Sequence, residues 1–238
     1  MRAYMQTAAQ LRAYFEQLDI AAGGRLPAER ELVRVLGVSR PTLREALIVL
    51  ELQDEIEIRV GSGIYLKKTP ERENDTSDTA QSTDPGLTLQ PEDSTEDVYQ
   101  MRYLLEPSIA ARAARLMPVS QIRKLKKCLD DMIQAHRSNA SNAVQRMADA
   151  DRAFHITLAE STDNNLVIQT VTRLFDHRNL PIANKMHTHF EDRDSWRIAI
   201  EEHHLVYEAI KNRDPLQAQA TMQRHLSQTH MHLMKLID

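Results

Sequence analysis

Apolar residues near the start of the chain recur every three or four positions, and this spacing predicts helices. Gly37 is suited to end a helix, and Ser39 and Pro41 are suited to the cap and first turn of the next one. The predicted helices span residues 5–18, 27–36 and 40–53. The short interval that contains Gly37 is typical of a helix-turn-helix.

Alternation of apolar and polar residues replaces the helical spacing directly afterwards. It predicts two short strands, at residues 56–60 and 64–66, joined by a turn at Gly61-Ser62-Gly63. Three helices followed by a small hairpin predict a winged helix-turn-helix over residues 1–68.

The remainder of the chain, from residue 94 to 238, shows no strand pattern. Glycine is absent after Gly86, which suits helices joined by short turns. Amphipathic helices are predicted at 94–115, 119–137, 142–161, 164–178, 191–212 and 214–236. The chain is therefore predicted to be mainly α, with an N-terminal winged helix-turn-helix and a C-terminal all-α helical bundle.

Composition separates these two parts and limits the class of protein. Residues 69–98 hold nine acidic residues and one basic residue, so we predict a disordered acidic linker over 69–93. No apolar run approaches the roughly 18 residues that span a bilayer, and the N-terminus lacks the apolar segment of a secretory signal. The single cysteine, Cys128, cannot form an internal disulfide, which fits the cytoplasm. We therefore expect a cytoplasmic protein without a membrane partner.

The third predicted helix carries Arg40 and Arg44 on one face, away from its leucines. Arginine at this end of a recognition helix can donate two hydrogen bonds to guanine. Arg30 is placed for a phosphate or base contact, and the turn at Gly61 can lie against the DNA. The alternative is a solvated face on which these arginines pair with nearby glutamates.

Metal-ligand residue types are concentrated in the predicted bundle, which holds all ten histidines. Asp151 and His155 are spaced i, i+4, so they project from one helical face. His203 and His225 lie on apolar faces of two later helices, and the four side chains could converge on a divalent transition metal. Hydrogen-bonded core histidines are the alternative.

The N-terminal part closely resembles the DNA-binding domain of GntR-family bacterial transcription regulators. The resemblance rests on Gly24–Leu32, Leu36–Arg40, Leu43–Leu47 and Gly61–Gly63. It implies that the residues contacting operator DNA are Arg30, Ser39, Arg40, Thr42, Arg44 and, in the wing, Gly61. Val60 departs from members that carry a polar residue at the wing tip, which leaves the wing contacts less defined.

The C-terminal part resembles the ligand-binding FCD domain of the FadR subfamily. The matching segments lie around Asp151–His155, His203–Ile210 and Arg224–Leu226. In metal-binding members an aspartate and three histidines hold the ion, which implies Asp151, His155, His203 and His225 here. The metal is predicted to be zinc, with nickel or manganese as alternatives. Members that bind acyl-CoA lack the three histidines, so the set argues against a fatty-acid sensor.

Two arginines are candidates for binding an anionic effector. Arg102 matches a pocket-facing position of relatives, although a salt bridge to Glu106 at i, i+4 is the alternative. The run from Arg178 to Trp196 resembles the branch of regulators that sense hexuronates and related sugar acids, and implies a role for Arg178.

Two functions of different class remain. The first is a transcription regulator, expected to be a repressor and not an enzyme, which binds a palindromic operator as a homodimer and responds to a small carboxylate. The second is a metal-dependent hydrolase of small acids with a DNA-binding appendage. Glu202, beside His203, is its one candidate general base, and adjacent helical residues face different directions.

Overall fold

The computed structural model describes residues 3–67 and 93–233. Contacts within the chain define two compact units. Unit 1 holds the N-terminal residues to Thr95 together with residues 179–190, and unit 2 holds Glu96–Arg178 and Glu191–Leu233. Nearly all of the predicted linker, 69–93, lies outside the described residues.

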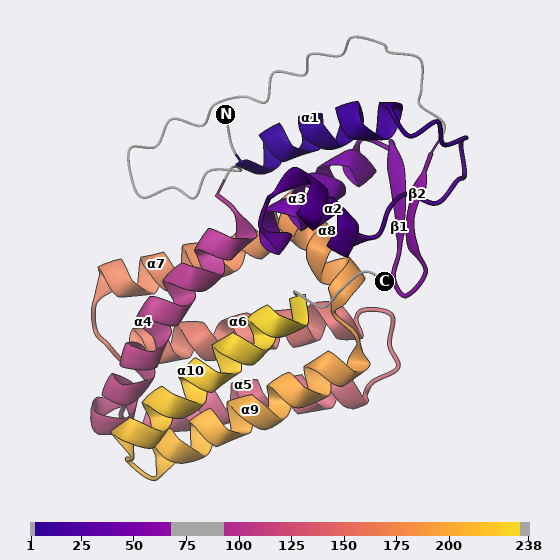
Figure 1. Ribbon diagram of the computed structural model, residues 1–238. Helices are drawn as coiled ribbons and strands as arrows, with labels where there is room; N and C mark the ends of the chain where they lie inside the picture. The colour runs from indigo at the N-terminus through magenta and orange to yellow at the C-terminus, as the bar shows by residue number, and fades with distance from the viewer. Residues whose placement is uncertain (1–2, 68–92, 234–238) are drawn as a thin grey trace. The chain divides into compact units, whose positions relative to one another are not determined.

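Unit 1 begins with three helices, α1 (Ala3–Glu16), α2 (Glu29–Leu36) and α3 (Arg40–Leu52) (Figure 1). Gly37 ends α2 in the left-handed conformation, with φ of 66°. The Ser39 hydroxyl accepts a hydrogen bond from the Thr42 backbone N–H and so caps α3, while Pro41 lies in its first turn. The predicted helix-turn-helix and its capping residues are confirmed.

The wing of unit 1 is an antiparallel hairpin of β1 (Ile56–Arg59) and β2 (Gly63–Leu66). Its register pairs Ile58 with Ile64, and both side chains are buried. Gly61 has φ of 73° in the exposed turn, a conformation that glycine adopts without steric cost.

A further helix, α8 (Pro181–Phe190), belongs to unit 1 although it follows most of unit 2 in the sequence. Its Met186 is fully buried in a core with residues of the first three helices and the hairpin. That core includes Leu11, Leu32, Leu43, Leu47, Leu50 and Ile64. The sequence pattern did not predict this helix.

Unit 2 is built from six α-helices, in the number and order predicted. They are α4 (Thr95–Leu116), α5 (Val119–Arg137), α6 (Ala143–Glu160), α7 (Asn165–Asp176), α9 (Arg193–Lys211) and α10 (Pro215–Leu233). Helix α6 packs on α5, and α10 packs on α9. Their shared core includes Phe154, Leu158, Val206, Ile210 and Leu226. The predicted fold class, mainly α with one small hairpin, is confirmed.

Among the residues described, we find no helix with the length and apolar character needed to cross a membrane.

Candidate metal centre and DNA-contacting residues

Four side chains from three helices of unit 2 meet at one point. Asp151 and His155 lie on α6, His203 on α9 and His225 on α10. Their ligand atoms all lie within 4.8 Å of one another. The three histidines are buried, whereas Asp151 is half-buried. The structure therefore brings together all four residues that the sequence singled out.

Each histidine is oriented through its other ring nitrogen. His203 Nδ1 lies 2.6 Å from the Ala199 carbonyl oxygen, which can only accept, so this nitrogen carries the hydrogen. His155 Nδ1 contacts the Glu106 carboxylate, and His225 Nδ1 lies 3.1 Å from Glu202 Oε2. Such partners fix the tautomer and aim the remaining nitrogen of a metal-binding histidine at the ion.

The remaining nitrogens converge in a way that calls for positive charge. His155 Nε2 and His203 Nε2 are 3.1 Å apart, and Asp151 Oδ1 lies 2.9 Å from His203 Nε2. When the hydrogens are on Nδ1, each Nε2 presents a lone pair and Asp151 Oδ1 presents a negative charge. These three atoms repel one another unless a cation or a proton lies between them. Imidazole nitrogens with one carboxylate are ligands that suit a divalent transition metal. The residues therefore fit the predicted ion.

The ionisation of the cluster agrees with that fit. Burial raises the pKa of Asp151, but hydrogen bonds with His155 and His203 outweigh it and hold the pKa well below its usual range. Burial, followed by the neighbouring histidines, lowers the pKa of His225 well below its usual value. An ionised carboxylate and a neutral imidazole are the forms that bind metal. Burial lowers the pKa of His155, but the charges and hydrogen bonds of Glu106 and Asp151 together outweigh burial and raise the pKa, so the site attracts positive charge.

Arg102 supports this centre from α4. Its Nε donates to Glu106 Oε1 at 2.7 Å, and its guanidinium carbon lies 4.1 Å from the centre of the Phe175 ring. Burial raises the pKa of Glu106, but the charges of Arg102 and His155 outweigh it and lower the pKa to about 2. The salt bridge expected as the alternative for Arg102 is therefore present, and it holds the carboxylate that orients His155.

Glu202 has a comparable position behind His225. Burial raises the pKa of Glu202 to about 7, partly offset by the charge of Arg224. Its carboxyl group contacts the Nδ1 side of His225, opposite the nitrogen available to an ion. A general base for metal-activated water would have to reach the water itself. The structure does not support the hydrolase alternative.

Arg178 is held where the chain leaves α7, in a short 3-10 turn at His177–Asn179. Its two terminal nitrogens donate to the two carboxylate oxygens of Glu191, with 2.8 Å between Nη1 and Oε1. The guanidinium carbon lies 5.7 Å from the Trp196 ring centre. Burial lowers the pKa of Arg178, but the charge and hydrogen bonds of Glu191, together with smaller contributions from Tyr99 and Asp151, outweigh burial and raise the pKa. Arg178 is thus a paired positive charge on which the candidate metal ligand Asp151 also acts.

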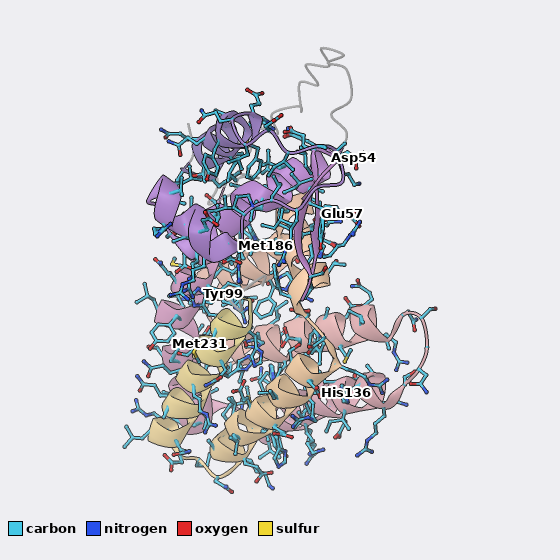
Figure 2. All side chains as sticks on the ribbon, turned by 45° about the vertical axis from the view of Figure 1, so that its right-hand side comes forward. Asp54, Glu57, Tyr99, His136, Met186 and Met231 are labelled. Atoms are coloured by element: carbon cyan, nitrogen blue, oxygen red, sulfur yellow. The ribbon has the colours of Figure 1, made fainter. Side chains whose placement is uncertain are left out.

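A pocket of about 370 Å³ lies beside this region, between α4 and α10. Tyr99 and Met231 belong to its wall and are labelled in Figure 2. None of the four candidate metal ligands lines it, and most of the residues that do are apolar or aromatic. A sugar acid needs many hydrogen-bonding partners, so this pocket is a poor site for one.

Five of the six predicted DNA-contacting residues are accessible in unit 1. Arg30 is exposed near the start of α2, Arg40 is exposed at the start of α3, and Gly61 is exposed in the wing. Ser39 is exposed and Thr42 half-buried, and their hydroxyl oxygens are 2.8 Å apart.

Arg44 differs from the other five, because its side chain has no solvent exposure. Its Nε lies 3.0 and 3.1 Å from the two carboxylate oxygens of Glu29 on α2, and its guanidinium carbon lies 4.8 Å from the centre of the Phe190 ring. The prediction that Arg44 points outward to DNA is wrong, because this position of α3 faces α2 and α8. Arg44 instead links α3 to α2 through its ion pair with Glu29 and to α8 through its contact with Phe190.

Three glutamates of unit 2 take part in the site, of which the sequence named Glu106 only as a salt-bridge partner and Glu202 only as a candidate base, and did not name Glu191. Glu106 and Glu191 bind the two candidate effector arginines, and Glu202 orients a histidine. The spacing of Glu106 from Arg102 was a usable signal, because it matched a salt bridge. Glu191 had no comparable signal, since its partner lies across α8 in the sequence.

Comparison with known proteins agrees with both parts of the structure. The profile described as bacterial regulatory proteins, gntR family, matches residues 3–66, and the FCD domain profile matches residues 97–228. These ranges correspond to the helix-turn-helix with its wing and to the helices that carry the four candidate metal ligands.

Individual relatives are regulators. The chain is 30% identical to the Uxu operon regulator of Haemophilus influenzae, covering 100% of this chain and 84% of that protein. It is also 30% identical to the Exu regulon transcriptional regulator of Escherichia coli K12, covering 98% and 84%. The solved structure of E. coli McbR/YncC is 17% identical, covers 98% of this chain and 97% of that one, and has a TM-score of 0.52, which shows a shared fold.

Proposed function

We propose that a metal-bound carboxylate controls the binding of this protein to operator DNA. The premise is that the chain belongs to the GntR family of bacterial regulatory proteins and is a transcriptional regulator with an FCD domain. The observation that carries the proposal is the convergence of three oriented imidazoles and one carboxylate inside unit 2. Four protein ligands leave open positions on an octahedral ion, and a carboxylate can occupy them. We propose zinc as the ion, with nickel or manganese as alternatives.

The proposed effector is a hexuronate or a related sugar acid. Two relatives are named for Uxu and Exu operons and match almost the whole chain. Arg178 offers a forked pair of donors that suits a carboxylate, and the charge of the candidate ligand Asp151 acts on it. Arg102 adds a second buried positive charge near the same cluster.

The proposed output is repression by a homodimer on a palindromic operator. A closed twofold dimer presents two recognition helices to two half-sites, one helical turn apart. In each unit 1, Arg30, Ser39, Arg40, Thr42 and Gly61 form the proposed DNA-contacting set. Effector binding in unit 2 shifts the balance between protein arrangements that bind DNA differently.

Replacing Arg40 by alanine is expected to weaken specific operator binding by about 1–3 kcal/mol, because one base-contacting arginine is removed. The measurement is fluorescence anisotropy on a duplex selected from a random library. Arg123→Ala is the matched control, since it removes an exposed arginine from α5 in unit 2. An Arg40→Ala protein that binds this duplex as tightly as the control would count against the assignment.

Binding of the effector is tested by thermal unfolding against a panel of sugar acids and other organic acids, with and without chelator. A ligand that binds only the native state, at a hundredfold excess over its Kd, is expected to raise Tm by about 5–10 °C. The expected result is a shift with hexuronates that chelator abolishes. A shift that is the same after metal removal would contradict the metal's proposed role.

A further inference from the structure

One segment within unit 2, residues 179–190, belongs to unit 1 instead, and we call it the excursion. The chain leaves unit 2 after Arg178, contributes residues 179–190 to unit 1 and rejoins unit 2 at Glu191. Figure 1 draws the helix of this excursion, α8, beside α3. The residues at its two ends, Arg178 and Glu191, are ion-paired.

Helix α8 is anchored in unit 1 by packing and by charge. Met186, labelled in Figure 2, is fully buried in the core of that unit. His189 Nε2 lies 2.6 Å and Lys185 Nζ 3.7 Å from Glu51 Oε2 on α3. Phe190 covers the buried Arg44 guanidinium. A displacement of α8 would therefore alter its contacts with Glu51 and Arg44 on α3, the helix that also carries Arg40.

The ion pair at the base of the excursion uses the arginine that the effector is proposed to bind. Glu191 presents both carboxylate oxygens to the two terminal nitrogens of Arg178, and both side chains are largely shielded from solvent. A free carboxylate that bound Arg178 in the same forked geometry would need the position that Glu191 now holds. Glu191 and such a ligand therefore compete for one guanidinium.

We propose that Glu191 is a built-in competitor of the effector, whose carboxylate replaces it on Arg178 and so releases the C-terminal end of α8. This step rests on the proposed function, because it uses the same effector site. Because the effector carboxylate replaces the Glu191 carboxylate, Arg178 remains paired with one negative charge. The preference for the ligand then comes from its other contacts, at the metal and through its hydroxyl groups, while release of Glu191 loosens the segment anchored on α3.

Glu191→Gln tests the proposal, because it keeps the size of the side chain and removes the competing charge. Hydrogen–deuterium exchange of residues 181–190 in the full-length protein without effector is expected to be about tenfold faster than in the wild type. Glu201→Gln is the matched control, since it removes a glutamate that is exposed on α9 and pairs with Arg197. Unchanged exchange in Glu191→Gln would overturn the proposal.

The competition itself is measured with D-glucuronate and D-galacturonate as probes. We expect the variant to bind the active hexuronate about tenfold more tightly than the wild type, and we expect hexuronate to speed exchange of 181–190 only in the wild type. Equal affinity in both proteins would overturn the competition. If neither hexuronate shifts the wild-type Tm, the proposed effector and the competition both fail, while the ligand-free comparison still decides whether Glu191 holds α8.

Discussion

Replacing His203 and His225 together by alanine is expected to abolish stoichiometric metal and the response to effector, while operator binding without effector is retained. The two histidines supply half of the candidate ligands and come from different helices, α9 and α10. The two ligands left on α6, Asp151 and His155, cannot enclose an ion as four ligands do. The proposed DNA-contacting residues lie in unit 1, which has a hydrophobic core of its own.

Metal content is measured by elemental mass spectrometry on protein purified without added metal. His230→Ala is the matched control, because His230 lies on α10 outside the cluster and pairs with Glu96. Circular dichroism establishes that the double variant keeps its helices. One equivalent of metal in the folded double variant would contradict the site.

Replacing Glu29 by alanine is expected to destabilise unit 1 by about 3–5 kcal/mol, because it leaves the Arg44 guanidinium buried without its carboxylate. Neither side chain of the pair has any solvent exposure. The loss is measured by urea denaturation, with Glu31→Ala as the control at an exposed position of the same helix.

The double variant Glu29→Leu, Arg44→Met is expected to recover most of this loss, because it replaces a buried ion pair by apolar groups of similar size. Its stability separates the effect of an uncompensated charge from that of lost packing. A Glu29→Ala protein as stable as Glu31→Ala would contradict the buried pair and would restore Arg44 as a candidate at the protein surface.

Local pattern was enough to predict most of the fold. The caps at Gly37 and Ser39 depend on residues next to them in the sequence, and they were predicted correctly. The spacing of Asp151 and His155 required only that α6 be a helix. Convergence with His203 and His225 followed from their positions on apolar faces, which are buried in unit 2.

What the sequence could not show depends on contacts between distant residues. The i, i+4 spacing placed Arg40 and Arg44 on one face of α3 but did not reveal that Glu29 and Phe190 cover Arg44. Helix α8 was missed because it is short and its burial partners lie in unit 1. The pairing of Glu191 with Arg178 could not be predicted, because the segment between them, residues 179–190, folds into unit 1 and brings its two ends together.

The central claim, that a metal couples a carboxylate effector to DNA binding, is tested most directly by one titration. The Kd for operator DNA is measured with increasing hexuronate, once with metal-loaded protein and once with protein stripped by chelator. We predict that hexuronate changes operator Kd by about tenfold in the loaded protein and leaves it unchanged in the stripped protein. Equal changes in both, or no change in the loaded protein with any hexuronate, would contradict the account.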